Sequence, residues 1–512
     1  NYLRLKLNPT DQQNIYGTKV TLYQQGQLSQ VFQVTNTRGY MSKSEDIVHF
    51  GMGNDLQVDK IVVEWQNGVR NILEKVNTNQ LVEVYQKDAM LTDPLTKDTN
   101  QNLLFQNIAE ALGLDKVVQK ENNYNDYSKE VLLPHKMSQF GPCIGVGDVN
   151  GDKRDDFYLG AAAGYSGTLF IQNKNGKFDK IEQGAWTQDQ KSEDMGIAFI
   201  DVDGDSDLDM FVVSGGNEFS PEDTALQDRL YINNGKGKFT KKANGVPQYL
   251  SSGSCVVPND FDKDGDMDLF VGGRLIPGKY PHPASSHLLE NKGGSFHEIT
   301  TDKAPELTNL GLVTAARWTD HNKDGLSDLV IVGEWMSVTF FTQTPDGHFE
   351  KQIPDGLEDS QGWYYEVQAH DMDNDGDEDY IVGNLGLNYK YKASIHEPFE
   401  VYSSDFDNNG SLDIVLSYYE HGEAFPVRGK DCSTQQIPDI GNKFGTYEKF
   451  GDSNLGEVYG ESLKDALNLQ AKTFASAYIE NLGNGSFKII PLPNLAQVSS
   501  INNILVKDYN SD

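Results

Sequence analysis

Short apolar runs, separated by polar turns rich in aspartate, organise most of the chain. The runs are apolar at consecutive positions instead of alternate ones, which is typical of strands buried on both faces of a sheet. They occupy residues 157–159, 210–213, 269–271, 329–332, 380–382 and 414–416. Most are followed by a further strand, a glycine turn and a fourth strand, as in 169–178 and 230–239. Four strands in every 50–60 residues predict the blades of a β-propeller.

The first 88 residues have a different pattern, in which apolar and polar positions alternate along short segments. We expect strands over 2–7, 19–23, 31–35, 47–50, 60–65 and 81–85, because alternation is typical of strands with one buried face. This predicts a small β-sandwich over 1–88 and a polar linker over 89–100. The propeller would then occupy 101–512, with an additional strand over 101–108 that pairs with the last blade and closes the ring.

A nine-residue pattern of acidic side chains precedes each apolar run. It begins at Asp148, Asp201, Asp260, Asp320, Asp371 and Asp405, and a seventh copy starts at Asp508 and is cut off by the end of the sequence. Seven copies predict an all-β fold with seven blades, the last one truncated, in a fragment of a longer chain. The 103-residue spacing before Asp508 leaves room for an insertion on the propeller rim at about 418–472.

The spacing of the acidic residues indicates oxygen ligation of a hard cation. Side-chain oxygens at positions 1, 3, 5 and 9, with the residue at position 7 contributing a backbone carbonyl, can surround one Ca²⁺, and a glycine at position 4 or 6 permits the turn. Mg²⁺ is less suited, because it prefers fewer carboxylates and retains water. The candidate metal ligands are Asp148, Asn150, Asp152, Arg154 and Asp156; Asp201, Asp203, Asp205, Asp207 and Asp209; Asp260, Asp262, Asp264, Asp266 and Asp268; Asp320, Asn322, Asp324, Leu326 and Asp328; Asp371, Asp373, Asp375, Asp377 and Asp379; and Asp405, Asp407, Asn409, Ser411 and Asp413.

The net charge of the chain is explained largely by these loops. The formal charge is −33, and the loops contain 27 aspartates and Glu378 against four basic residues. So many crowded carboxylates would repel one another without counter-ions, which favours bound cations. An acidic chain is also a poor ligand for nucleic acid or for anionic membranes. No apolar run is long enough to span a bilayer.

The loops and the strands that follow them resemble FG-GAP/VCBS repeats, which form calcium-binding propeller blades in integrin α-subunits and bacterial surface proteins. Residues 17–23, His49-Phe-Gly-Met-Gly53, 58–68 and Asn79-Gln80 resemble the ASPIC/UnbV module that accompanies such propellers in relatives of cartilage acidic protein. Residues 133–138, 272–281, 333–335 and 383–388 are similar to the bacterial branch. Lys153 and Asn409 depart from the repeat pattern, so we expect weaker calcium binding in the first and sixth loops.

The resemblance implies an exported protein, either secreted or anchored as an outer-membrane lipoprotein. The favoured function is a non-enzymatic, calcium-stabilised scaffold that recognises a glycan or a surface protein, with a TonB-dependent outer-membrane transporter as one such partner. One alternative is a calcium-dependent enzyme similar to polysaccharide lyases, and another is a structural subunit of an uptake complex. No nucleophile-elbow, Walker A or zinc-protease motif is present. The loop aromatics, among them Trp186, Trp335, Trp363, Tyr364, Tyr365 and Tyr389, would serve either blade packing or sugar stacking.

Overall fold

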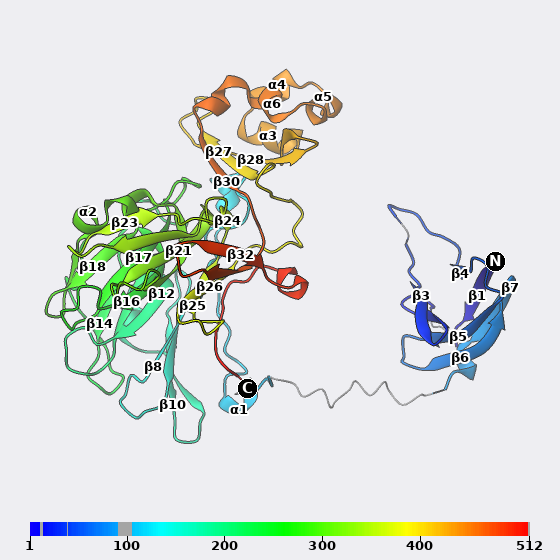
Figure 1. The fold of residues 1–512 in the computed structure, drawn as a ribbon, viewed down its shortest axis with the longest axis horizontal. Helices are drawn as coiled ribbons and strands as arrows, with labels where there is room; N and C mark the ends of the chain where they lie inside the picture. Colours follow the sequence, from blue (N-terminus) through cyan, green and yellow to red (C-terminus); the bar gives the residue numbers. More distant parts are fainter. Residues whose placement is uncertain (11–13, 38, 91–104, 510–512) are drawn as a thin grey trace. The chain divides into compact units, whose positions relative to one another are not determined.

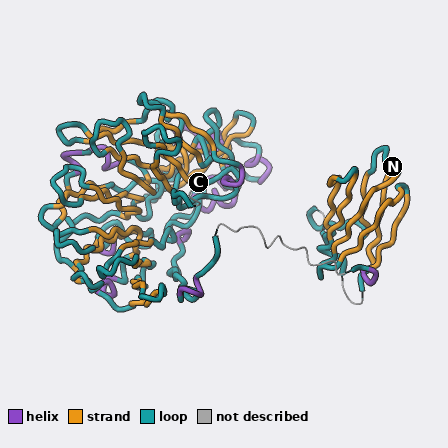
Figure 2. The backbone as a smooth tube through the Cα atoms, turned by 60° about the horizontal axis from the view of Figure 1, so that its bottom comes forward, coloured by secondary structure: helices purple, strands orange, loops and turns teal. Residues whose placement is uncertain are grey.

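The computed structural model describes residues 1–10, 14–37, 39–90 and 105–509, and the chain divides into two compact units, Asn1–Asn107 and Ile108–Asp512. Strands dominate each unit and the helices are short (Figure 2). The all-β prediction is therefore confirmed. Within the described residues, every helix is too short or too polar to cross a bilayer. Most of the predicted linker over 89–100 lies outside the described residues.

The first unit consists of two sheets that enclose one core. A mixed sheet has the order β4-β1-β7, and an antiparallel sheet has the order β3-β2-β5-β6. The strands are β1 (Tyr2–Asn8), β2 (Lys19–Gln24), β3 (Gln27–Gln33), β4 (Ile47–Gly51), β5 (Gln57–Glu64), β6 (Arg70–Asn77) and β7 (Gln80–Tyr85). Strand β6 was not predicted, because this edge strand has no fully buried residue and so lacks an apolar alternation.

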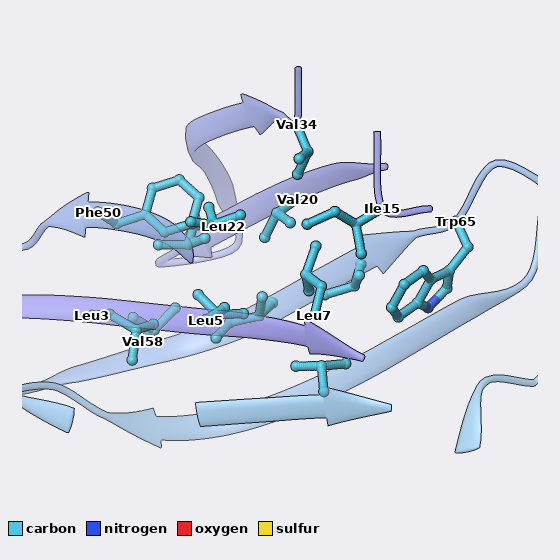
Figure 3. Packing of buried hydrophobic residues seen from close by; sticks show 14 of the residues in the cluster. Leu3, Leu5, Leu7, Ile15, Val20, Leu22, Val34, Phe50, Val58 and Trp65 are labelled. Atoms are coloured by element: carbon cyan, nitrogen blue, oxygen red, sulfur yellow. The ribbon is translucent and has the colours of Figure 1, made fainter. Parts of the chain in front are cut away.

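Alternation along β1 explains the packing of this unit. Leu3, Leu5 and Leu7 are buried, whereas the residues between them are half-buried or exposed. The leucines belong to the same cluster as Val20 of β2 and Val58 of β5 (Figure 3). Burying a leucine or valine side chain stabilises a fold by about 1.5–3 kcal/mol, so this shared cluster holds the two sheets together.

Within its described residues, the second unit contains five consecutive antiparallel sheets whose first strands follow one another in space as they do in sequence. Four of them have four strands, and the fourth sheet has a short fifth strand. Contacts run from β8 to β12, then to β16, β20 and β25. The strands are β8 (Ile144–Gly147), β9 (Asp156–Leu159), β10 (Thr168–Gln172) and β11 (Phe178–Ile181); β12 (Glu193–Ile200), β13 (Asp209–Gly215), β14 (Arg229–Ile232) and β15 (Thr240–Lys241); β16 (Ser252–Asn259), β17 (Asp268–Leu275), β18 (His287–Asn291) and β19 (Phe296–Glu298); β20 (Leu312–Thr319), β21 (Asp328–Met336), β22 (Thr339–Gln343) and β23 (Phe349–Gln352), with β24 (Gly362–Trp363) beside β21; and β25 (Glu366–His370), β26 (Asp379–Gly383), β31 (Ala477–Asn481) and β32 (Phe487–Pro491).

The second strand of a propeller sheet is buried on both faces. This confirms that the continuous apolar runs predict strands covered on both sides. Every residue of β13, β17 and β21 is buried. In β13, Met210 and Val212 pack in a cluster with the preceding sheet, whereas Phe211 and Val213 pack with the following sheet. Sheets stacked face to face around a common centre are the arrangement of a propeller. The fold is therefore propeller-like, as predicted.

The fifth sheet is interrupted by an insertion, and this corrects one part of the prediction. Seven consecutive blades would give the sixth acidic loop, at Asp405, a blade of its own. Instead β31 pairs with β26, with Ile479 opposite Tyr380, and completes the sheet that begins at β25. The hydrophobic core explains this pairing, because Ala477 and Ile479 pack with Val382 in a cluster that also contains residues of the fourth sheet.

The insertion has its own sheet, so the sixth acidic loop does not lie in a consecutive blade. The sheet has the order β29-β28-β27-β30, and four short helices follow β29 (Figure 1). This insertion is larger than the 418–472 that we predicted. Its elements are β27 (Phe399–Ser404), β28 (Asp413–Glu420), β29 (Glu423–Pro426), α3 (Lys430–Gln436), α4 (Asp439–Lys443), α5 (Tyr447–Gly451), α6 (Leu455–Tyr459) and β30 (Leu467–Ala471).

Two predictions concern the ends of the propeller. The closing strand over 101–108 lies partly outside the described residues, and its described part, 105–108, forms no strand before the short helix α1 (Ala109–Leu112). The seventh loop starts at Asp508, and residues 510–512 of that loop lie outside the described residues. A seventh blade therefore stays a prediction.

Candidate metal loops

All six complete acidic loops connect the first and second strands of a sheet. Five join β8 to β9, β12 to β13, β16 to β17, β20 to β21 and β25 to β26, and the sixth joins β27 to β28 in the insertion. The loops of the five propeller sheets therefore all follow the first strand and precede the buried second strand. The sixth loop reproduces this local connection on a separate sheet.

The loops share one backbone conformation that the sequence predicts only in part. Positions 4 and 6 both have positive φ in each of the six loops, although glycine occupies only one of the two positions in each copy. In the second loop these are Gly204 (φ 79°) and Ser206 (φ 72°). The non-glycine residues in this left-handed conformation are Lys153, Ser206, Lys263, Lys323, Asn374 and Asn408. Such residues cost about 1–2 kcal/mol each, so the repeated conformation indicates a shared functional requirement.

The ninth residue anchors each loop to the interior of its sheet. Asp209 is fully buried, its Oδ2 accepts the Val202 amide (3.1 Å), and its Oδ1 accepts the Asn233 amide beyond β14 (2.8 Å). The ninth residues of the first, third and fifth loops accept two equivalent backbone hydrogen bonds. Burial of the ninth carboxyl raises the pKa of Asp209 to about 6 and that of Asp268 to about 7.

The remaining acidic side chains direct oxygens into the loops. In four loops, oxygens of three carboxylates lie within 4.8 Å of one another: Asp201, Asp203 and Asp209; Asp260, Asp262 and Asp268; Asp371, Asp373 and Asp375; and Asp405, Asp407 and Asp413. Buried oxygens without a hydrogen-bond donor occur in Asp207, Asp260, Asp266, Asp371 and Asp377. Asp260 and Asp371 belong both to a cluster and to this set, so two of the clusters combine close carboxylates with an oxygen that lacks a donor. This arrangement fits a hard divalent cation, and Ca²⁺ accepts several carboxylate oxygens.

The first and fourth loops differ from the other four. In the first, the Arg154 guanidinium forms an ion pair with Asp152, and its Nε donates to the Gln172 carbonyl (3.0 Å). In the fourth, His321 Nε2 lies 3.4 Å from Asp328 Oδ2. Neither loop forms a three-carboxylate group within the described part of the chain, because asparagine replaces aspartate at position 3. Weaker binding by the first and sixth loops stays a prediction.

The motifs that resemble the bacterial branch meet in one buried cluster beneath the insertion. Arg274 and His135 both contact the carboxylate of Glu334, which is fully buried, and Tyr280 donates to its second oxygen (3.2 Å). Burial opposes ionisation of Glu334, but the two basic groups lower its pKa to about 2. Trp335 belongs to the hydrophobic part of this cluster, together with inserted-sheet residues Phe399, Val401, Ile414 and Leu416. The residues of these motifs therefore pack against the inserted sheet.

The aromatic residues that sequence analysis offered for sugar stacking are mostly used for packing. Trp186, Trp335, Trp363 and Tyr364 are at most 5% exposed, and Tyr365 and Tyr389 are partly buried against the cluster beneath the insertion. A second set of partly buried tyrosines, Tyr391, Tyr418 and Tyr419, was missed. We define the tyrosine groove as the cavity of about 460 Å³ that is lined by Lys390, Tyr391, Lys392, Tyr418 and Tyr419, together with Ala393, Ser394, Glu397 and Val427. The adjacent tyrosines and the alternating lysines were the signal in the sequence.

Comparison with known families agrees with these observations. The family model described as ASPIC and UnbV matches residues 8–90, and the FG-GAP-like repeat model matches residues 148–212, 201–271 and 320–382. No curated protein matches the chain. Among solved structures, AofleA from Arthrobotrys oligospora is 10% identical, with 73% of this chain and 83% of that chain covered and a TM-score of 0.30. A Lactobacillus plantarum protein is 11% identical, with coverages of 80% and 95% and a TM-score of 0.28.

Both TM-scores are too low to imply a shared overall fold. The family models carry the assignment, because each matches the part of the chain whose residues resemble it. The chain is an FG-GAP repeat protein with an ASPIC/UnbV module.

Proposed function

We propose that this FG-GAP repeat protein is a calcium-stabilised, non-catalytic binding scaffold that works outside the cell and recognises a glycan. The observation that carries the calcium part is the shared loop conformation, together with the clusters of three carboxylates in four of the loops. The ions would be held by the acidic side chains at positions 1, 3, 5 and 9, and bound Ca²⁺ would neutralise them. Loops exposed to solvent suit the millimolar calcium found outside cells, because extracellular modules bind calcium only at 10⁻⁴–10⁻³ M.

The tyrosine groove supports the glycan part. Tyr391 stacks on Phe399 with ring centroids 5.3 Å apart, which fixes its orientation, and Lys390 Nζ lies 5.0 Å from the Tyr391 ring centroid. Tyrosine rings offer an apolar face for a sugar ring and a hydroxyl for hydrogen bonds. Lys390 and Lys392 add positive charge at a site on an otherwise acidic chain, so the favoured ligand is an acidic polysaccharide.

Distance argues against the lyase alternative at this groove. The acidic loop of the inserted sheet ends at Asp413, at the start of β28, whereas Tyr418 and Tyr419 lie near the end of this strand. Strands rise about 3.3 Å per residue, so roughly 20 Å separate the metal loop from the groove. A base in the groove would therefore be too far from that metal to share a sugar with it, which favours binding without cleavage.

The test is binding of the full chain to a panel of acidic and neutral polysaccharides in calcium, with product analysis of every hit. The Lys392→Ala/Tyr419→Ala variant should lose at least tenfold in affinity. Tyr447→Ala is the matched control, since Tyr447 is 67% exposed on α5 and lies outside the groove. New reducing or unsaturated ends would replace the proposal with the lyase alternative. Binding only to a surface protein, such as a TonB-dependent transporter, would reject the glycan part.

A further inference from the structure

Glu193 is a buried acid without a partner, at the end of its strand opposite to the acidic loop. It is the first residue of β12, and its residue exposure is 1%. Neither of its carboxylate oxygens has a hydrogen-bond partner. The next residue, Asp194, is equally buried but pairs with Arg229 at 2.7 Å. Natural folds rarely leave a buried carboxylate unpaired, so Glu193 requires a separate explanation.

A second carboxylate converges on the same space. Glu218 follows β13, and a Cβ built on Gly216 would lie 2.6 Å from Glu218 Oε2 and 2.7 Å from Glu193 Oε2. Both carboxylates therefore occupy the space beside the Gly216 backbone, which has φ +102° and no side chain to block them. Glu218 is held in place because its Oε2 accepts the Asn217 amide (2.9 Å).

The segment before the first sheet adds further oxygens. Asn122 Nδ2 donates to Glu218 Oε1, which leaves the buried Asn122 Oδ1 without a partner. Glu121 Oε2 is also buried and without a partner, while its Oε1 accepts from Gln119 Nε2 (2.7 Å). This segment thus brings a third carboxylate and an amide oxygen to the two acids on β12 and after β13.

No basic side chain balances these charges. Over residues 105–509, none of Glu121, Glu193 and Glu218 forms an ion pair, whereas Asp194 and Glu334 each have an arginine. Burial first, and then Glu218 and Glu121, raise the pKa of Glu193 to about 10. One proton shared between Glu193 and Glu218 would satisfy one oxygen of each, and Glu121 Oε2 and Asn122 Oδ1 would remain unpaired. A divalent cation would satisfy several oxygens and reduce the repulsion at once.

We propose that Glu121, Glu193 and Glu218, with the side-chain oxygen of Asn122, bind a divalent cation of the Ca²⁺ class. The site lies at the ends of β12 and β13 opposite to the loop 201–208 and does not depend on the acidic loops. Several carboxylates and an amide oxygen are the ligand set that Ca²⁺ prefers, whereas Mg²⁺ keeps more water. The ion would fasten the segment 119–122 to the second sheet.

Calcium stoichiometry of the full chain tests this site. Equilibrium dialysis against saturating Ca²⁺ should give one ion fewer for Glu193→Gln/Glu218→Gln than for the wild type. Glu182→Gln is the control, because the Glu182 side chain is 64% exposed. Asp203→Asn, in the second acidic loop, reports separately on the proposed loop sites. An unchanged count in the double variant would overturn the proposal, even if Asp203→Asn loses its ion.

A second variant covers the case in which the double variant does not fold. Glu121→Gln lies on a partly exposed segment and should weaken binding of one ion at least tenfold while leaving the fold intact. In EDTA, Glu193→Gln should melt at a temperature close to that of the wild type, since the amide and the protonated carboxyl of Glu193 are both neutral. If Glu121→Gln binds every ion with wild-type affinity, the site does not exist as proposed.

Discussion

Tyr380 in β26 lies opposite Ile479 in β31, so two strands on either side of the whole insertion form adjacent strands of one propeller sheet. Both side chains are fully buried, in a cluster shared with the fourth sheet. The insertion therefore leaves the sheet between its second and third strands and returns to it. This pairing makes the stability of the propeller depend on residues that follow the insertion.

Shortening the side chain of Ile479 to alanine should destabilise the protein strongly. Removing a buried isoleucine side chain leaves a cavity and costs about 2–5 kcal/mol, so Ile479→Ala should lower the free energy of unfolding by this amount. Ile395→Ala is the matched control within the insertion, because Ile395 is 55% exposed and should cost less than about 0.5 kcal/mol. Urea unfolding in calcium measures both. Equal effects would show that β31 does not pack in the core.

Substitutions at the two left-handed positions of the second loop should have opposite effects on the stability of the protein. Ser206→Gly removes the strain of a side chain at φ 72° and should stabilise the protein by about 1 kcal/mol. Gly204→Ala adds a side chain at φ 79°, with no atoms near enough to clash, and should destabilise it by about 1 kcal/mol. Thermal unfolding in calcium tests the pair. A destabilising Ser206→Gly would contradict the loop conformation.

The buried ninth carboxyls predict the pH dependence of the calcium-free protein. Burial raises the pKa of Asp209 and Asp413 to about 6, and that of Asp268 and Asp328 to about 7. Because the pKa in the folded state lies above the ordinary aspartate value of 3.8, protonation favours the folded state. The resulting stability is fully present below pH 3.8 and is lost as the pH rises through 6 to 7.

Calcium should reverse this trend, since the ion binds the ionised carboxylates. Melting temperatures between pH 5 and 8 should fall with rising pH in EDTA and rise in calcium. The two series should therefore diverge most above pH 7. Parallel curves in the two conditions would mean that these carboxyls do not bind the ion.

The first loop contains a positively charged side chain, Arg154, and replacing it should raise the calcium affinity of the loop. Arg154 pairs with Asp152, so its positive charge competes with Ca²⁺ for this carboxylate. Arg154→Met should raise the calcium affinity of the first loop several-fold and lower the melting temperature in EDTA. Asp155→Asn is the control, because Asp155 is exposed at the eighth position. Calcium titration followed by calorimetry separates the variants. A weaker first site in Arg154→Met would contradict this role.

The acidic loops could be predicted from the sequence because each is a local pattern of nine residues that recurs. Burial of second strands such as β13 was predicted for the same reason, as its apolar run is continuous. The insertion could not be delimited, because Phe399–Ser404, the loop at Asp405 and β28 carry the same local signals as a blade. Only the pairing of Tyr380 with Ile479 separates the two cases, and local pattern does not determine long-range pairing.

The acidic site at Glu193 was hidden for a related reason. Its three carboxylates come from separate segments, at 121, 193 and 218, and no repeat places them together. The tyrosine groove likewise brings Tyr391, from the segment before β27, together with Tyr418 and Tyr419 of β28. Both sites arise from packing between elements, whereas the metal loops arise from one short segment each.

The melting temperature of the full chain in millimolar Ca²⁺, millimolar Mg²⁺ and EDTA tests the central claim most directly. Each site that binds only the folded state adds about 2.7 kcal/mol when the free ion is at one hundred times its Kd, so several sites should raise the melting temperature strongly. We predict a large rise of the melting temperature in calcium and little change in magnesium. An equal melting temperature in calcium and EDTA would contradict it.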